Sequence, residues 1–395
     1  MLKLKQNSTP ADRRRPRRRV GLIAAAAVAV LAIAVSSASA ATNTPAAVLG
    51  GGSDVMFHVS SALDLLYNES PGCTTIAPSG TQPLNNSCVT QPGDPTTEDR
   101  YHDRISEANP IGGSAGVTQL CSQGTAGVAK INYVRQTSAP SASVCSGLDY
   151  VAFARDAITF ETFPGASGSD FQPGDNQTGN CAGDNTHLCL TVSQLQGIFV
   201  NCSITNWNQV GGNNAPIKIY TVLPQFGTSK AWYTFLGGGS STSCGATAID
   251  QTNNDEIKPA DLADAIVPVS VGSWNERYSA SPGGSALGDV EGVSPTPTNI
   301  LHSTFQFSRF LYNVYCAATK CGTAPKASTA TIRYMGFNGW ICKVPASHAA
   351  VDPITGANYR TEIANTITQY GFVPLLLGPL GGGTTITNYC QLFKT

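Results

Sequence analysis

Short apolar runs alternate along the chain with segments whose apolar residues have helical spacing. Residues 46–49 form a brief apolar run that stops at three consecutive glycines. The segment after them has apolar residues at helical spacing, with Ser53 or Asp54 as a suitable N-cap. Its apolar face consists of Val55, Val59, Leu63 and Leu66. The pattern therefore predicts a strand, a glycine loop and a helix, in that order.

The same order of elements returns further along the chain. Residues 217–222 alternate between apolar and polar positions as a strand does, and residues 230–236 continue as a helix. Further helices are expected at residues 193–200, 259–266 and 359–370, and further strands at residues 150–154 and 267–271. Strands that alternate with helices predict an α/β architecture.

A basic stretch and a short apolar run precede this pattern. Arginines at residues 13–19 are followed by an apolar run at residues 20–35 and by Ala38-Ser39-Ala40. The run is too short to span a bilayer and ends in small residues, so we expect a signal peptide over residues 1–40, cleaved near Ala40. A membrane anchor is the alternative, and the sequence leaves Sec or twin-arginine export open. Since the next cysteine is Cys73, no lipid anchor is indicated, and we expect a secreted or periplasmic protein.

Composition and charge narrow the partners. Without the leader 395 − 40 = 355 residues remain, enough for two domains that each bury a core. The leader holds 8 of the 24 basic and 1 of the 25 acidic residues, so the remainder has 16 basic against 24 acidic residues, a net charge of −8. We therefore expect no nucleic-acid partner.

The cysteines predict disulfides. All 12 lie after residue 40, an even number in an exported chain. None is spaced as Cys-x-x-Cys, and the 5 histidines show no ligand spacing, so we expect neither a metal site nor a cofactor. Short sequence separations favour the pairs Cys73–Cys88, Cys121–Cys145, Cys181–Cys189, Cys202–Cys244, Cys316–Cys321 and Cys342–Cys390. Sequence alone leaves the connectivity open.

Four segments combine small polar residues with glycine or charge near strand ends or helix starts. They are Gly52-Ser53-Asp54, residues 112–116, Arg155-Asp156 and Gly227-Thr228-Ser229. Helix starts present unpaired N–H groups and partial positive charge, so several that converge can hold an anion without a metal. Each segment alone is more often a simple helix cap. Ligands of α/β folds bind at the carboxyl ends of strands, which favours an anion site.

Two neighbouring stretches carry a family resemblance. Leu190–Phe199 (LTVSQLQGIF) and Ile204–Gly212 (ITNWNQVGG) resemble the phosphate-binding branch of the ABC-transporter substrate-binding proteins. The resemblance extends over most of the chain after the leader and thins in the cysteine-bearing loops. It implies an α/β, two-lobed type II periplasmic-binding-protein fold with a hinge and an interlobe cleft, stapled by disulfides. The lobes would be residues 41–156 with 300–395, and residues 157–299.

The resemblance also implies roles for single residues. Ser53 and Ser114 would donate hydroxyl bonds, and Thr228 and Ser229 would cap the anion from a helix start. Asp156 would accept a proton from a protonated phosphate, which fully ionised sulfate lacks. The candidate ligand-binding set is Ser53, Asp54, Ser114, Arg155, Asp156, Gly227, Thr228 and Ser229.

One feature of the family is missing. Relatives carry an arginine shortly before the Gly-Thr segment, whereas residues 222–225 read Val-Leu-Pro-Gln. Arg155 is the candidate replacement, and an ion pair with Asp156 or another acid is its alternative role. The expected protein is a monomer that captures phosphate or a similar small oxyanion for import through an ABC permease, and is not an enzyme.

Two other functions compete with this hypothesis. Residues 112–116 match Gly-x-Ser-x-Gly, the nucleophile elbow of serine hydrolases, with Ser114 as nucleophile and His187, His302 or His348 as base. An elbow needs a buried strand directly before the serine, and residues 107–110 make a poor one. A secreted glycan or cell-wall binding module is the other alternative, although scattered aromatics more often pack cores. Its candidate aromatics are Tyr67, Tyr101, Trp207, Trp232, Trp274 and Trp340.

Overall fold

The computed structural model describes residues 47–69, 104–163, 171–250, 256–278, 285–343, 358–375 and 390–395. The expected signal peptide and the expected pair Cys73–Cys88 lie outside these ranges. Within them, none of the helices is both long and apolar enough to cross a membrane.

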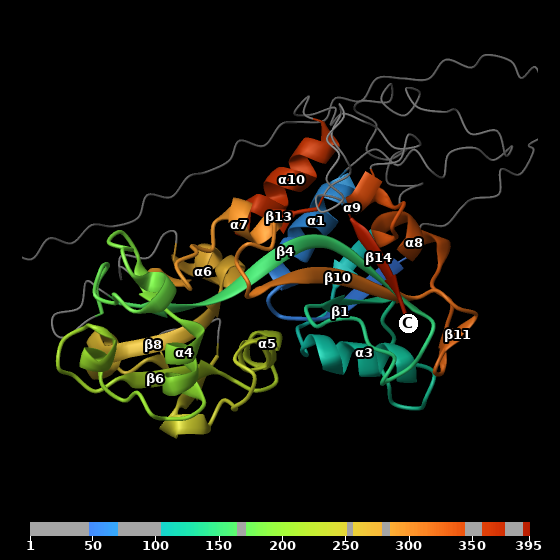
Figure 1. The fold of residues 1–395 in the computed structure, drawn as a ribbon. Coiled ribbons are helices and arrows are strands. Elements are labelled where there is room, and N and C mark those ends of the chain that lie inside the picture. The colour runs from blue at the N-terminus through green and yellow to red at the C-terminus, as the bar shows by residue number, and fades with distance from the viewer. Residues whose placement is uncertain are drawn as a thin grey trace, which may run out of the picture. The chain divides into compact units, whose positions relative to one another are not determined.

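Strands and helices alternate along most of the chain (Figure 1), as the apolar pattern predicts. The strands are β1 (Ala47–Gly52), β2 (Arg104–Glu107), β3 (Tyr133–Gln136), β4 (Leu148–Thr162), β5 (Leu188–Leu190), β6 (Lys218–Val222), β7 (Thr247–Ile249), β8 (Ala265–Ser270), β9 (Ala286–Val290), β10 (Ser308–Cys316), β11 (Lys320–Cys321), β12 (Ala324–Pro325), β13 (Val373–Pro374) and β14 (Gln391–Lys394). The α-helices are α1 (Phe57–Glu69), α3 (Gly113–Ser122), α4 (Val192–Phe199), α5 (Gly227–Phe235), α6 (Val271–Tyr278), α7 (Pro297–Leu301), α8 (Thr329–Met335), α9 (Trp340–Lys343) and α10 (Tyr359–Gln369).

Strand β4 connects two groups of strands. The order is β2-β1-β3-β10-β4-β8-β6-β7, with β1 parallel to β2 and β3, and β6 parallel to β7 and β8. Strand β10 runs antiparallel to both β3 and β4, and β8 runs antiparallel to β4. Figure 1 shows β4 and β10 side by side where they pass from one group to the other.

The two groups enclose separate hydrophobic cores. Along β4, Phe153 and Ala154 pack in the first core with α1 and α10, whereas Ala157 and Ile158 pack in the second with α4 and α5. Fourteen of the 15 residues of β4 are buried, as expected of a strand that is covered on both faces. The strand therefore passes from the first core to the second at Arg155 and Asp156.

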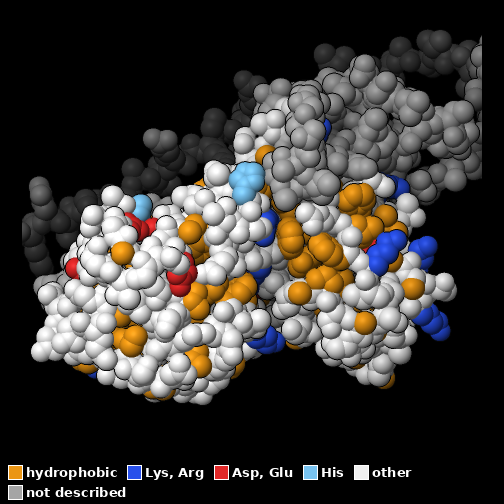
Figure 2. Space-filling model, viewed as in Figure 1, with side chains coloured by type: hydrophobic (Ala, Val, Ile, Leu, Met, Phe, Trp, Pro, Cys, Tyr) orange, Lys and Arg blue, Asp and Glu red, His pale blue; other side chains and the backbone are white. Residues whose placement is uncertain are grey.

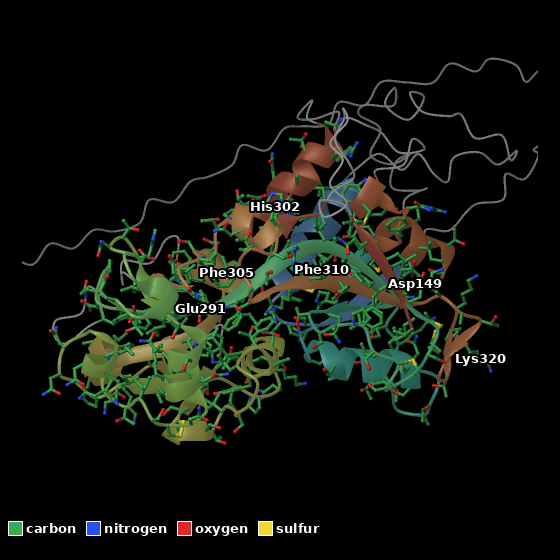
Figure 3. All side chains as sticks on the ribbon, viewed as in Figure 1. Asp149, Glu291, His302, Phe305, Phe310 and Lys320 are labelled. Carbon is green, nitrogen blue, oxygen red and sulfur yellow. A yellow bond between two sulfur atoms is a disulfide. The ribbon has the colours of Figure 1, made fainter. Side chains whose placement is uncertain are left out.

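The chain returns through β10. Phe305 and Phe307 pack in the second core, and Leu311 packs in the first (Phe305 and Phe310 are labelled in Figure 3). Ile300 also packs in the second core, so the chain reaches the first core between Phe307 and Leu311. The two lobes are therefore connected by β4 and β10.

One expected helix is shorter than its pattern suggests. Residues 259–264 form a 3-10 helix, and the chain then enters β8 at Ala265. Ala265 and Ile266 belong to a fully buried strand, which apolar content alone does not distinguish from the end of a buried helix.

Five of the six expected disulfides are confirmed. They are Cys121–Cys145, Cys181–Cys189, Cys202–Cys244, Cys316–Cys321 and Cys342–Cys390. Each bridge joins residues that lie close in sequence and belong to the same lobe. Such links restrict the unfolded chain, and each adds about 2–4 kcal/mol to the free energy of unfolding.

Candidate anion site between the lobes

An ion pair is buried where β4 and β10 cross between the lobes. Asp156 lies opposite Arg309 in the register of the two strands. Arg309 donates to Asp156 Oδ2 from Nε at 3.1 Å and from Nη2 at 2.8 Å, and Nη2 also reaches Thr228 Oγ1 at 3.3 Å. The side chains of Arg309 and Asp156 are 6% and 0% exposed. This buried cation therefore connects the crossing strands to the start of α5.

Asp156 has other donors besides Arg309. The Ser270 hydroxyl donates to both carboxylate oxygens at 2.9 Å, and the Gly272 N–H donates to Oδ1 at 3.3 Å. Gly272 lies in the first turn of α6, where partial positive charge favours a carboxylate. Its oxygens thus accept bonds from Arg309, from Ser270 and from the start of α6, and its expected role toward a protonated phosphate stays a prediction.

Arg155 does not join this cluster. Successive side chains of a strand point to opposite faces, so Arg155 and the neighbouring carboxylate diverge. Arg155 Nη1 donates to the Leu301 carbonyl at 2.9 Å and to the Ser303 hydroxyl, and its guanidinium lies 4.6 Å from the Phe310 ring centroid. Among the described ion pairs, the arginine that pairs with Asp156 is therefore Arg309 and not Arg155.

Helix α5 begins in this cluster without a capping side chain. Its N-cap residue, Phe226, makes no side-chain hydrogen bond to the helix. The first N–H groups of any α-helix lack acceptors within the helix. Thr228 and Ser229, in this first turn, are 0% and 3% exposed. A buried helix start without a cap is suited to bind an anion.

A loop from the first lobe meets the start of α5. Thr137 directly follows β3, whose last residue is Gln136. A Cβ atom on Gly227 would lie 2.2 Å from Thr137 Oγ1 and 3.7 Å from Arg309 Nη1. Only glycine permits this approach, so Thr137, Gly227 and Arg309 come together from the two lobes and the crossing.

Ser53 is fixed at the carboxyl end of β1. Its N–H donates to the Arg135 carbonyl at 2.9 Å, and Arg135 Nε donates back to the Ser53 carbonyl at 3.0 Å. Arg135 is itself fully buried and pairs with Glu107. The backbone of Ser53 is thus held by β3, while its hydroxyl takes no part in these bonds.

Asp54 carries a strongly perturbed carboxyl group. Burial raises its pKa from 3.8 to about 6, although bonds from the backbone N–H groups of Asp54 and Val55 and the charge of Arg309 act to lower it. The Coulombic effect of Arg309 puts Asp54 in the electrostatic environment of the Asp156–Arg309 pair. This carboxyl group therefore keeps its proton to a higher pH than an exposed aspartate does.

Three buried polar atoms around the cluster have no partner among the described residues. They are Ser53 Oγ, Thr137 Oγ1 and Arg309 Nη1. A buried donor that is left unsatisfied costs about 1–3 kcal/mol, and more for a charged group. All three can donate, so an oxyanion with several acceptor oxygens would satisfy them.

Ser114 lies apart from these buried groups, at the exposed start of α3. Its hydroxyl accepts a bond from Lys230 Nζ at 3.3 Å. Strand β2 ends at Glu107, so the strand that a nucleophile elbow requires does not lead directly into Ser114. The recorded partner is a lysine from α5 and not a histidine. The bond therefore joins the two lobes at the edge of the cleft.

A cavity of about 550 Å³ opens beside the cluster. Thr137 and Arg309 line it together with the loop after β3, one side of α5 and the start of β10. Figure 2 shows apolar side chains gathered on this face around β10. The cavity therefore lies between elements of both lobes and is continuous with the candidate anion site.

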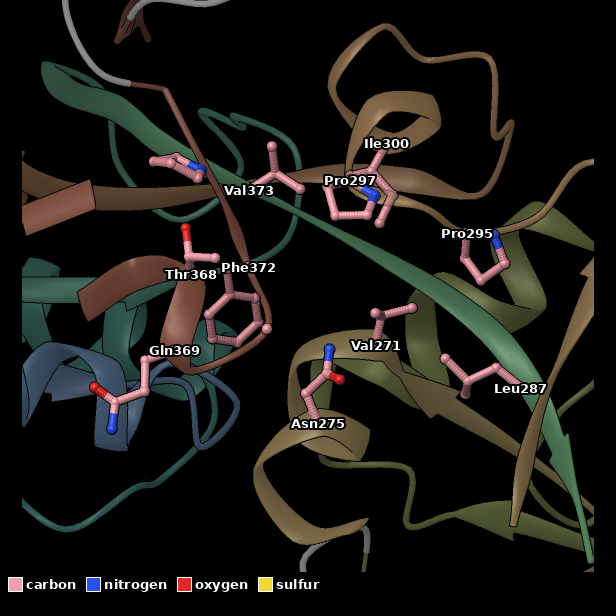
Figure 4. Close-up of a pocket in the computed structure, with 12 residues that line it drawn as sticks. Val271, Asn275, Leu287, Pro295, Pro297, Ile300, Thr368, Gln369, Phe372 and Val373 are labelled. Atoms are coloured by element: carbon pink, nitrogen blue, oxygen red, sulfur yellow. The ribbon is translucent and has the colours of Figure 1, made fainter. Parts of the chain in front are cut away.

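A second cavity, of about 360 Å³, has a different character (Figure 4). Its lining comes mainly from α6, α7, α10 and β13, with Val271, Ile300 and Phe372 among the apolar contributors. None of its lining residues is charged. It therefore offers no cation to an anionic ligand.

A third grouping was not visible in the spacing of the sequence. Candidate ligand atoms of Asp184, His187 and Asp289 lie within 4.8 Å of one another. His187 Nδ1 is 3.3 Å from Asp289 Oδ2, which also accepts a bond from Ser294 Oγ at 2.7 Å. Burial raises the pKa of Asp289 to about 6. These side chains already bond to one another, and an acidic group of this kind is not by itself a metal site.

The aromatic residues proposed for glycan binding lie mostly in the cores. Tyr67, Trp207, Trp232 and Trp340 are each at most 1% exposed. Trp274 donates from Nε1 to Ser285 Oγ at 2.9 Å, and Tyr101 lies outside the described residues. Four of the six candidates thus serve packing and offer no surface to a sugar.

The fold and this site together define a two-lobed binding protein with a buried cation between its lobes. The model of the PBP superfamily domain, the family of periplasmic-binding-protein folds, matches residues 112–335. The match covers more than half of the chain, so the chain belongs to this family, and the predicted fold is confirmed. The comparison with curated proteins gives no match.

Two solved structures resemble most of the chain. An ABC-type phosphate transport receptor from Vibrio cholerae is 16% identical, with 82% of this chain and 99% of that chain covered and a TM-score of 0.51. A phosphate ABC transporter substrate-binding protein from Clostridium perfringens, solved with bound phosphate, is 18% identical, with coverages of 83% and 99% and a TM-score of 0.50. At this identity the likeness shows the fold.

Sequence reasoning missed Arg309 and Thr137. The signal for Arg309 was present, since it is a single charge in the otherwise uncharged stretch from Phe305 to Tyr315. A lone charge in a buried strand needs a partner, which pointed to a carboxylate on the strand beside it. Thr137 carried no comparable signal, because Thr-Ser-Ala-Pro reads as an ordinary loop.

Proposed function

We propose that this protein captures phosphate or a similar small oxyanion in the cleft between its lobes and delivers it to an ABC permease. The oxyanion would accept bonds from Ser53 Oγ, Thr137 Oγ1, Arg309 Nη1 and the first N–H groups of α5. Asp156 would hold Arg309 in place without touching the ligand. The observation that carries this proposal is the buried, unpartnered Arg309 Nη1 beside an uncapped helix start.

The site would act by closing on its ligand. Donors from both lobes and from the crossing strands meet at Gly227, so a bound anion stabilises the arrangement in which the lobes touch. The overall negative charge of the chain does not oppose this binding, because surface charge is screened beyond about 8–10 Å while the donors act at contact. We expect a monomer that binds its ligand without turning it over, outside the cytoplasm and away from nucleic acid.

A thermal-shift series tests this function. The chain without residues 1–40 is heated alone and with phosphate, sulfate or a neutral oligosaccharide. A ligand at one hundred times its Kd adds about 2.7 kcal/mol to the free energy of unfolding, so phosphate should raise the midpoint clearly. Sulfate should raise it less, because a carboxylate in the cleft, such as that of Asp54, would accept a hydrogen bond from an oxyanion that keeps a proton and would only repel one that keeps none.

The other outcomes separate the competing functions. A shift with oligosaccharide alone would favour the glycan module over the anion receptor. Hydrolysis of an ester substrate that is lost in Ser114→Ala would favour the hydrolase. If none of the three ligands moves the midpoint, the cleft does not bind an oxyanion.

A further inference from the structure

The cavity beside the anion site is far larger than an inorganic oxyanion requires. It has a volume of about 550 Å³. A water molecule takes up about 30 Å³ of liquid, so an ion of five heavy atoms displaces on the order of three or four waters, roughly 100 Å³. Pockets for organic ligands span about 300–1,000 Å³. Most of this space therefore remains after the oxyanion is in place.

The extra space begins at the anion site itself. Thr137 and Arg309 line the cavity, and both carry an unpartnered donor at the anion site. A ligand whose charged end is held by these two residues would direct its other end toward the cavity that they line. The cavity is thus an extension of the same site and not a second one.

The wall away from the anion site is largely apolar. Pro140 and Ala139 come from the loop after β3, and Ala231 and Phe235 come from one side of α5. Phe235 stacks on Phe307 at 4.9 Å between ring centroids, so its position is fixed by packing. An apolar surface next to a cation and a helix start suits a ligand with one charged end and one organic end.

The remaining wall is the surface of β10. Phe310 and Tyr312 line the cavity there, and Tyr312 is 4% exposed. Arg155 lies over the Phe310 ring and donates from Nη1 and Nη2 to a backbone carbonyl and to hydroxyl oxygens. Its charge therefore keeps the phenyl ring in place at the cavity wall.

We propose that the physiological ligand is a phosphomonoester, with its phosphate at Arg309 and α5 and a compact apolar organic group in the cavity. This inference rests on the proposed function and names the substrate class of the same site. A phosphomonoester presents three terminal oxygens and carries a charge of about −1.5 to −2 near neutral pH. Its fourth oxygen carries the organic group, which leaves the anion site on the side of Thr137.

Calorimetric titration with phenyl phosphate, inorganic phosphate and phenol tests the proposal. Phenyl phosphate should bind at least about tenfold more tightly than inorganic phosphate, because its ring leaves water for an apolar wall. Phenol, which lacks the anion, should not bind measurably. Equal or weaker binding of phenyl phosphate, with inorganic phosphate still bound, overturns the phosphomonoester and leaves the anion receptor intact. Failure of both phosphates to bind overturns both.

Substitutions that fill the cavity locate the organic group. Ala231→Trp, or Thr234→Trp at an exposed position of the same wall, should lower the ratio of phenyl phosphate to inorganic phosphate affinity at least about tenfold. Leu65→Trp, on the exposed face of α1, is the control and should keep the native ratio. An unchanged ratio in both cavity variants would place the ring elsewhere and contradict the proposal.

Discussion

The placement of one cation at a strand crossing decides what the cleft can bind. Arg309 is buried against Asp156, and a buried pair of this kind loses several kcal/mol when one partner is removed. Bonds from Ser270 and Gly272 supply Asp156 with further donors, so the carboxylate keeps Arg309 in one orientation. In the proposed site Nη1 then remains for the ligand, and Asp156 would act as a positioning residue.

Asp54 predicts a pH-dependent stability. Its pKa is raised by burial from 3.8 to about 6, so the folded chain holds this proton more tightly than the unfolded chain. The resulting contribution to stability is present at low pH and disappears as the pH rises from about 4 to about 6. Asp54→Asn removes the buried charge and should raise the free energy of unfolding at pH 7.5 by about 2 kcal/mol, with little change at pH 4.

Urea unfolding of the native chain and of Asp54→Asn at the two pH values measures this difference. Each comparison is made at one pH, so the titration of other groups, including Asp289, cancels. A stability difference that is the same at pH 4 and pH 7.5 would show that the Asp54 carboxyl is not desolvated in the folded chain.

At the scale of the element, the proposed anion site depends most on the start of α5. The helix opens on a glycine because the loop after β3 comes within contact distance of its first residue. The missing cap leaves N–H groups in a buried position, which an ordinary helix start avoids. This local departure from good capping is physically costly and indicates a binding role.

A methyl group at residue 227 should prevent Thr137 from approaching the start of α5 as closely as it does in the native chain. In Gly227→Ala the new Cβ meets Thr137 Oγ1, so the lobes cannot come together as closely around the anion. Phosphate affinity, measured by calorimetry, should fall at least about tenfold. Gly238→Ala is a matched control just after the same helix, because its Cβ would lie 3.6 Å from the nearest described atom, an ordinary contact.

The outcome separates crowding from loss of fold. The thermal midpoint of Gly227→Ala without ligand should stay near the native value, since alanine favours a helix more than glycine does. Native phosphate affinity in Gly227→Ala would contradict the close approach of the two lobes at this point.

Most elements were predictable from apolar periodicity, and their long-range contacts were not. The spacing of Val55, Val59 and Leu63 predicted α1, and the alternation at residues 217–222 predicted β6. The 15-residue length of β4 was not predicted, because a strand buried on both faces loses its alternation. The choice between Arg155 and Arg309 also required the register of β4 and β10, which no local pattern contains.

At the scale of the whole molecule, the disulfides lie within the lobes, and the crossing strands connect one lobe to the other. Cys121–Cys145 and Cys342–Cys390 lie in the first lobe, and Cys181–Cys189 and Cys202–Cys244 lie in the second. None of the five bridges of the described residues joins one lobe to the other. The bridges therefore stiffen each lobe separately, and none of the described ones restrains the rotation about β4 and β10 that closure on a ligand would need.

The central claim is that Arg309 binds the anion in the cleft. Calorimetric titration with inorganic phosphate tests it most directly, on the native chain, Arg309→Gln and Arg155→Gln, with the folded state of each checked by its thermal midpoint. Truncation of a buried charged contact typically costs about 2–5 kcal/mol, so Arg309→Gln should lose at least about 30-fold in affinity. Arg155→Gln, a neighbouring arginine directed away from the site, should bind nearly as the native chain does. Undiminished binding by Arg309→Gln, or an equal loss in Arg155→Gln, would contradict the account.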